Sequence, residues 1–144
     1  MAEGQVEAKT KKRMTATKAA ASIGPMVKEF ITGTLQAKAE GKQKVAYTFI
    51  VCHHEEIFRA LDVIPVWTEN FAGICGAKRD AERFLQRAES LGLSRSLCTY
   101  ALCGIGFDQW REELGQMPPE APWGGQVRPD FMISSGQILC DPRS

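Results

Sequence analysis

A single apolar run, residues 45–51 (VAYTFIV), constrains the fold more than any other feature of the sequence. The run is rich in β-branched and aromatic residues, which favour strands. It is also apolar on both faces, and this pattern is typical of a strand in a parallel sheet that helices cover on both sides. We therefore expect residues 45–51 to form a buried strand of a parallel α/β sheet.

Two further strands are expected. The first is a short strand over residues 63–67, in which Pro65 favours a position near a sheet edge or a strand end. The second covers residues 129–135 (PDFMISS). Because crossovers between parallel strands are right-handed, the carboxyl ends of all the strands should meet at one edge, where ligands usually bind.

Helical patterns separate these strands. One helix is expected over residues 55–61, with Ile57, Phe58 and Leu61 on one face, and a longer one from Gly76 to Leu91, which Gly92 ends. The stripe of the longer helix consists of Ala77, Ala81, Phe84, Leu85 and Ala88. Ser94 or Ser96 would cap a third helix that runs to about Leu114. Residues 115–127 contain three prolines and three glycines, so they are predicted to form a loop.

A helical arm precedes the sheet. Residues 15–39 have helical periodicity, and Gly24-Pro25 is expected to divide them into two helices, since proline suits a first turn. Gly41 is expected to end the helical arm. Residues 1–13 are predicted to form a mobile, solvated basic tail. The chain thus divides into a tail and arm over residues 1–43 and an α/β domain over residues 44–144.

Composition excludes several classes of protein. A chain of 144 residues with 44% hydrophobic and 24% charged residues is a soluble globular domain of ordinary size. A net charge of +1 gives no field that would favour nucleic acid, and no apolar run reaches the roughly 20 residues that cross a membrane. Five cysteines, an odd number, and a polar N-terminus without a signal peptide predict free or metal-bound thiols in the reducing cytoplasm.

The cysteines include no C-x-x-C pair, so a metal site would have to draw its ligands from distant segments. Cys98 falls in the first turn of the third expected helix, where the helix dipole favours the thiolate that binds iron. Cys52 ends the first strand and Cys140 follows the third. All three cysteines belong to the ligand-binding edge of the sheet.

The other candidates have simpler interpretations. Cys103 lies about 140° around the helix from Cys98, so we interpret it, like Cys75, as a packing residue. Cys52 remains open between packing and lining the site. His53 and His54 are adjacent and point in different directions, so exposure at a helix entry is favoured over an acid–base role.

Several segments together resemble one family. They are KVAYTFIVCHHEEIFRALDVIPVW, ENFAGICGAKRDAERFLQRAESLGLSRSLCTYALCGIGF and PDFMISSGQILCDPRS. The shared pattern is a strand, a helix leading to A-L-D-V-I-P, an A-E-x-x-G-L-S-R-x-x-C-[ST]-Y segment and a strand leading to C-D. Over residues 44–144 this resembles the N-terminal half of subunits of the 2-hydroxyacyl-CoA dehydratase and benzoyl-CoA reductase family.

The resemblance implies a flavodoxin-like or Rossmann-like sheet without a dinucleotide, and a 4Fe-4S cluster held by three cysteines. Two of these ligands correspond to Cys98 and Cys140. The third lies in the C-terminal half of the family, so the resemblance implies that the chain is truncated. The sequence departs from the family at Cys-His-His (residues 52–54), where a proline is frequent, and in residues 116–127, which look like an insertion.

Within the family, the segments A-L-D-V-I-P-V-W-T-E-N and C-D-P-R-S look more like the benzoyl-CoA reductase branch. This implies ATP-driven transfer of low-potential electrons to an aromatic acyl-CoA, with a paralogous cluster-binding subunit and ATP-hydrolysing electron-donor subunits as partners. Trp67, Glu69 and Asn70 are the expected pocket wall. The alternatives are a radical-type 2-hydroxyacyl-CoA dehydratase subunit and a non-catalytic α/β scaffold module.

Overall fold

The computed structural model describes residues 17–49 and 55–134, and these residues form an α/β fold with a parallel sheet. Its strands are β1 (Lys44–Thr48), β2 (Val63–Trp67) and β3 (Phe131–Ile133), in the order β2-β1-β3. Thr48 of β1 lies opposite both Trp67 and Ile133, so the three strands end at the same edge. The expected parallel sheet is confirmed, and Pro65 lies in a strand at its edge.

The central strand β1 is buried on both faces, as its apolar run predicts. Val45 and Ala46 are completely buried, and Tyr47 is nearly so. The start of β1 is held by Asp130, whose carboxylate accepts a hydrogen bond of 2.9 Å from the Val45 backbone N–H. The same carboxylate lies 2.5 Å from the Lys38 Nζ, so it also ties the N-terminal helix to the sheet.

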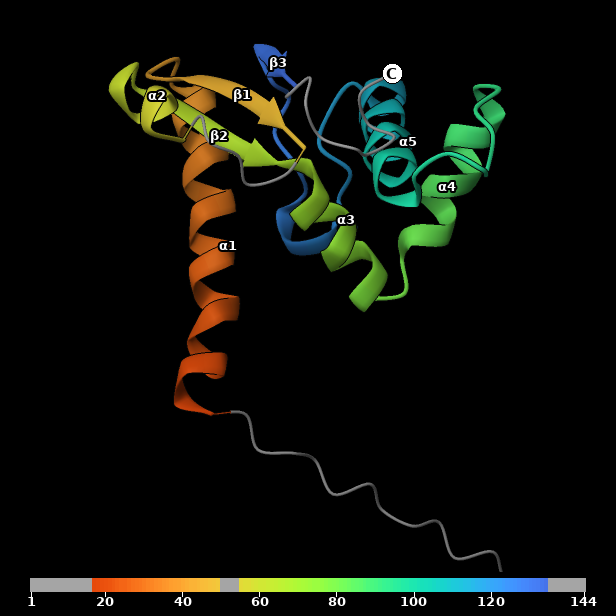
Figure 1. Cartoon of the computed structure of the whole chain (residues 1–144), viewed down its shortest axis with the longest axis horizontal. Coiled ribbons are helices and arrows are strands. Elements are labelled where there is room, and N and C mark those ends of the chain that lie inside the picture. Colours follow the sequence, from red (N-terminus) through yellow and green to blue (C-terminus); the bar gives the residue numbers. More distant parts are fainter. Residues whose placement is uncertain (1–16, 50–54, 135–144) are drawn as a thin grey trace, which may run out of the picture.

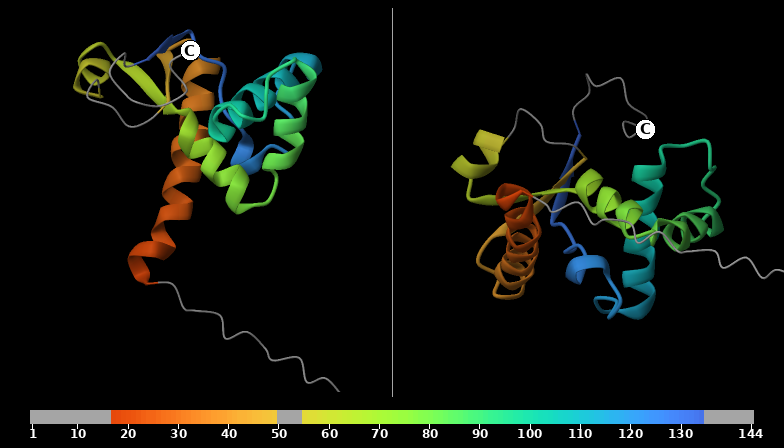
Figure 2. Two further views of the ribbon diagram at one scale, coloured as in Figure 1. Left: turned by 45° about the vertical axis from the view of Figure 1, so that its right-hand side comes forward. Right: turned by 90° about the horizontal axis from the view of Figure 1, so that it is seen from below.

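The described residues also form five α-helices and one 3-10 turn. They are α1 (Lys18–Ala39), α2 (Glu55–Ala60), α3 (Thr68–Ala77), α4 (Ala81–Ser90), α5 (Thr99–Leu114) and the turn η1 (Pro122–Gly124). The C-terminal half of α1 lies along the sheet, and its N-terminal half projects away as an arm (Figure 1). Helices α3, α4 and α5 form a separate group beside the sheet (Figure 2).

The core between these three helices is aromatic. Phe71 of α3, Phe84 of α4 and Phe107 of α5 pack together, with ring centroids 4.6 to 6.3 Å apart. Aromatic contacts of this kind add to the stability gained from burying the rings. Gly106 allows the close approach of α5 to α4, because a Cβ at this position would clash with the Phe84 carbonyl.

The predicted break at Gly24-Pro25 is wrong. Helix α1 is continuous from Lys18 to Ala39 with Pro25 inside it. Thr17 caps its start, with its side chain accepting a hydrogen bond from the Ala20 N–H. At the other end Gly41 adopts a φ of 64°, which confirms it as the stop. Enough good helix formers flank Pro25 for the helix to continue despite the missing N–H.

A helix was predicted from Gly76 to Leu91, and its predicted first residue is also wrong. The structure has two helices instead, because the chain turns at residues 78–80, where Arg79 has a φ of 60°. Helix α3 begins directly after β2, in a segment that the sequence analysis did not assign. Ala77 is therefore exposed, whereas Phe84 and Ala88 are buried as expected.

Two smaller expectations need correction. Cys98, not Ser94 or Ser96, is the N-cap of α5. Only Phe58 is buried among the apolar residues of the 55–61 segment, since Ile57 and Leu61 are exposed. No helix in the described part of the chain has the length and hydropathy to cross a membrane.

Candidate functional site

The carboxyl edge of the sheet is where the sequence analysis placed the site. Strand β2 passes straight into α3, and the Glu69 N–H in the first turn donates a 3.0 Å hydrogen bond to the Phe49 carbonyl, just after β1. This bond joins the chain leaving β1 to the helix leaving β2. Four predicted candidates, Cys52, His53, His54 and Cys140, lie outside the described residues.

Cys98 occupies the N-cap of α5, with φ −56° and ψ 118°. Its carbonyl accepts the Leu102 N–H at 3.0 Å, but its side chain makes no capping hydrogen bond. The thiol is partly exposed. The Cys98 thiol thus lies near the free backbone N–H groups in the first turn of α5, and none of them forms a capping hydrogen bond with it. This N-terminal end of the helix favours negatively charged groups.

Cys75 and Cys103 have a different role. Both are buried in the aromatic core, Cys75 on α3 and Cys103 on α5. The neighbouring Cys103 thiol and burial hold the pKa of the Cys75 thiol well above its ordinary value. The interpretation of both residues as packing residues is confirmed, and of the described cysteines only Cys98 is left accessible to a ligand.

The donor groups of the described residues do not by themselves complete a metal site. Across residues 17–49 and 55–134, no three His, Cys, Asp or Glu side chains are close enough together to hold a metal ion. Among these residues, Cys98 is the one accessible thiol, so they would supply a cluster with one thiol ligand. The remaining ligands would come from outside these residues, as the assignment of Cys140 requires.

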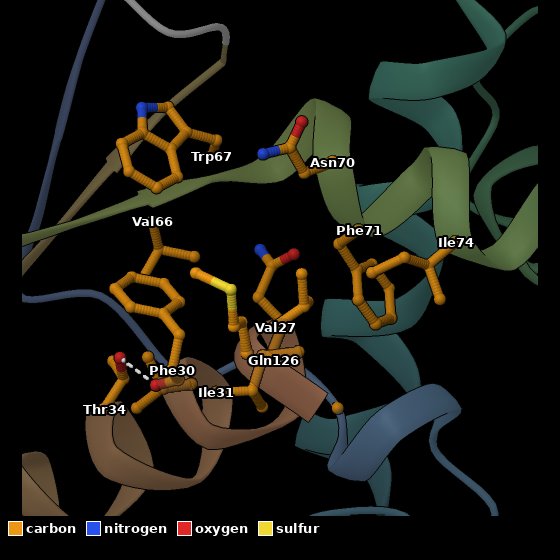
Figure 3. Close-up of a pocket in the computed structure, with 13 residues that line it drawn as sticks. Val27, Phe30, Ile31, Thr34, Val66, Trp67, Asn70, Phe71, Ile74 and Gln126 are labelled. Atoms are coloured by element: carbon orange, nitrogen blue, oxygen red, sulfur yellow. Dashed lines mark hydrogen bonds between the residues drawn. The ribbon is translucent and has the colours of Figure 1, made fainter. Parts of the chain in front are cut away.

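A cavity of about 270 Å³ lies between α1, the end of β2, α3 and the loop before β3 (Figure 3). Trp67 and Asn70, two of the three residues expected to form a pocket wall, line it, and Glu69 does not. Most of the lining is apolar, and α1 contributes part of it, including Val27, Phe30 and Ile31. The helical arm was predicted from the sequence, but its contact with the end of β2 and with α3 was not, because these segments are distant in sequence.

A polar cluster behind the cavity fixes the loop that closes it. The Tyr47 hydroxyl donates to the Val127 carbonyl at 2.6 Å, and Arg111 donates to the Gln126 carbonyl at 2.6 Å. Arg111 also pairs with Asp108 at 2.9 Å. Burial raises the pKa of Asp108 to about 6, although Arg111 opposes this shift.

This cluster of Tyr47, Asp108 and Arg111 was not predicted from the sequence. Its one visible signal was the i, i+3 spacing of Asp108 and Arg111, which places an acid and a base on one helix face. The partners from β1 and the loop are distant in sequence. Burial also raises the pKa of Tyr47 above its ordinary value, so the hydroxyl remains a hydrogen-bond donor.

Comparison with known proteins adds no family to this description. No protein-family model matches the chain, and no curated protein matches it. The family suggested by the sequence segments therefore stays a prediction.

Proposed function

We propose that the chain is an iron–sulfur subunit of an ATP-dependent, benzoyl-CoA reductase-like enzyme, with Cys98 and Cys140 as ligands of a 4Fe-4S cluster. The observation that carries the proposal is the position of Cys98. It is an accessible thiol at the N-terminus of α5, whereas Cys75 and Cys103 are buried against each other. The parallel sheet, with all three strands ending at one edge, is the architecture that the family resemblance implies.

The chemistry of Cys98 suits a cluster ligand. Iron–sulfur clusters are held by thiolates, and hydrogen bonds to the sulfur atoms tune their reduction potentials. The N-terminus of α5 would stabilise the negative charge of a thiolate, and its free N–H groups would donate to sulfur. A bound cluster would supply low-potential electrons one at a time.

The proposed overall reaction adds two electrons and two protons to the ring of an aromatic acyl-CoA and gives a cyclic dienoyl-CoA. ATP-hydrolysing partner subunits would deliver the electrons, and a paralogous cluster-binding subunit would complete the enzyme. Such chemistry belongs in a reducing compartment, so we place the protein in the cytoplasm. The residues that contact the substrate are left unassigned.

Iron content tests the cluster. The protein is purified anaerobically from the cells that make it, together with the subunits that copurify. We expect a brown protein with about four irons for each subunit that holds a cluster. A Cys98→Ala variant should lose the iron and the visible absorbance, whereas the matched Cys103→Ala variant should keep both, with thermal denaturation checking that each variant is folded.

Colourless, iron-free protein from the anaerobic preparation would overturn the cluster and leave the scaffold module as the better interpretation. Loss of iron in Cys103→Ala, but not in Cys98→Ala, would show that the wrong cysteine is assigned.

Substrate turnover distinguishes the two enzymes. The reduced complex is given ATP with either benzoyl-CoA or a 2-hydroxyacyl-CoA, and the products are separated by chromatography. We expect a cyclic dienoyl-CoA from benzoyl-CoA. Dehydration of the hydroxy substrate alone would instead identify the complex as a 2-hydroxyacyl-CoA dehydratase.

A further inference from the structure

The cavity has a lining that excludes charged ligands. Of the residues around its volume of about 270 Å³, none has an ionisable side chain. Phe30 of α1 and Trp67 of β2 stack at one side of it, with ring centroids 5.8 Å apart and planes 25° from parallel. The volume is close to the lower end of the range for small-molecule sites, roughly 300 to 1,000 Å³. Such a space suits a small, flat and uncharged molecule.

One buried polar group in this cavity lacks a partner. Gln126 is only 3% exposed, yet neither its amide nitrogen nor its amide oxygen forms a hydrogen bond with the described part of the chain. The Tyr47 hydroxyl lies near this amide and donates to the Val127 carbonyl, and no hydrogen bond of normal geometry joins it to Gln126. Figure 3 shows the Gln126 amide directed into the cavity, among the apolar side chains.

The backbone holds Gln126 in this position. Its carbonyl accepts a hydrogen bond of 2.6 Å from Arg111, which helps to hold the main chain in this orientation. The preceding residue, Gly125, has a φ of 88°, and a Cβ there would lie 3.0 Å from the Phe107 ring. The loop is thus held against the aromatic core, with the unpaired Gln126 amide in the cavity wall.

The other polar residues of the wall differ from Gln126. The Thr34 hydroxyl is already engaged, since it donates to the Phe30 carbonyl at 2.8 Å. Asn70 is exposed to solvent, so water can satisfy its amide. Burying an unpaired amide is unfavourable, and a ligand that pairs with both of its atoms would remove that cost.

We propose that this cavity binds a small, flat, uncharged molecule that presents a hydrogen-bond donor and an acceptor side by side, as a lactam does. The ligand N–H would donate to the Gln126 Oε1, and its carbonyl would accept from the Gln126 Nε2. The ring would lie against Phe30 and Trp67. The inference does not depend on the proposed function and would stand if the chain held no cluster.

A pair of probes tests the donor–acceptor requirement on the unmodified chain. 2-Quinolinone carries the lactam on a flat apolar ring system, and 1-methyl-2-quinolinone lacks only the N–H donor. Each is titrated into the chain while NMR follows the Trp67 indole and Gln126 side-chain amide signals. We expect 2-quinolinone to shift both signals in a saturable manner and to bind at least about tenfold more tightly than the methylated probe.

A variant pair tests the residue. Gln126→Leu keeps the approximate size of the side chain and removes both polar atoms, and Gln116→Leu makes the same change at an exposed position in the same loop. We expect Gln126→Leu to weaken 2-quinolinone about tenfold and to leave the methylated probe nearly unchanged, with Gln116→Leu affecting neither. Thermal denaturation should show that both variants are folded.

Three results would overturn the proposal. They are no saturable binding of 2-quinolinone, equal affinity for the two probes, and unchanged 2-quinolinone affinity in a folded Gln126→Leu variant. Loss of binding in Gln116→Leu would likewise place the ligand elsewhere. None of these results bears on the iron content of the protein, so this proposal and the cluster proposal can fail separately.

Discussion

Two glycines in α5 lie two residues apart and have different environments. A Cβ at Gly106 would overlap the Phe84 carbonyl on α4, whereas a Cβ at Gly104 would have no such neighbour within 4 Å. Both glycines belong to the short segment Gly104-Ile105-Gly106. The structure shows that the second of these glycines allows α4 and α5 to pack closely.

The two glycines give a matched pair of substitutions. Gly106→Ala should lower the free energy of unfolding by about 3 kcal/mol, because the backbone of α4 would have to move. Gly104→Ala should raise it by up to about 1 kcal/mol, because alanine has the higher helix propensity. Denaturant unfolding of both variants measures the difference. Similar effects in the two variants would show that the contact with Phe84 does not limit the packing.

For single residues, the sequence predicts the role of a side chain more readily than it predicts which distant residues will contact that side chain. The helix-start position of Cys98 and the packing of Cys75 and Cys103 could be predicted, because both depend mainly on local spacing. The unpaired amide of Gln126 could not be predicted. It depends on the Tyr47 hydroxyl, which donates to the Val127 carbonyl and not to Gln126. It also depends on α1, about 100 residues earlier in the chain, which forms another wall of the cavity.

Among the elements, α1 shows how tertiary structure overrides a local signal. It is 22 residues long and continues through Pro25, although proline removes a backbone donor and usually ends or kinks a helix. The contacts of its second half with the sheet and the loop stabilise the helix beyond the proline. The first half has exposed apolar residues, including Ile23 and Met26.

Replacing Pro25 should therefore strengthen the first half of α1. Pro25→Ala restores the N–H that can donate to the Ala21 carbonyl, and a proline inside a helix costs about 3 kcal/mol relative to alanine. We expect a larger helical circular dichroism signal and slower amide exchange in residues 18–24. Lys28→Ala, an exposed change in the same helix, serves as the control. Unchanged exchange in Pro25→Ala would show that the proline does not limit the arm.

The strands were predictable and some helix ends were not. Strands β1, β2 and β3 have strong local signals in the form of β-branched and aromatic runs. Most of helix α3 was not predicted, because residues 68–75 lack a clear helical signal, yet Phe71 and Cys75 are buried against α5 in the helical segment. The turn at residues 78–80 was not predicted, because apolar residues recur at helical spacing on both sides of it, from Ala77 to Ala88.

For the whole molecule, two carboxylates connect segments that are far apart in sequence. Asp130 joins β3 to β1 and to α1 through Val45, Lys38 and Lys44. These interactions hold the pKa of Asp130 well below its ordinary value, with the Lys38 contact contributing most. Asp108 is the opposite case, since burial raises its pKa to about 6.

Stability should therefore depend on pH through Asp130 in a defined window. A carboxyl whose pKa is lowered by folding stabilises the fold above its unfolded pKa of about 4, and this contribution is lost as the pH falls further. We expect Asp130→Asn to be less stable than the parent chain at pH 7 and the difference to shrink steadily below pH 4. Unfolding measured from pH 7 to pH 2 gives this comparison.

The pKa of Asp108 is shifted in the opposite direction from that of Asp130, so Asp108 affects stability in a different pH range. Because its pKa is raised, the stability associated with its protonated form is present below about pH 4 and is lost as the pH rises toward 6. Its effect therefore falls in a different window from that of Asp130. A constant difference between Asp130→Asn and the parent across the acid range would contradict the role given to the Asp130 ion pairs.

The three tryptophans of the chain lie at three different junctions. Trp67 stacks with Phe30 where α1 meets the sheet, and Trp110 contacts guanidinium groups of α4 from its position on α5. Trp123 lies in the η1 turn near the Lys78 ammonium. The molecule thus carries its own fluorophores, one at each junction. Chains that keep a single tryptophan would show by their emission which junction opens first during unfolding.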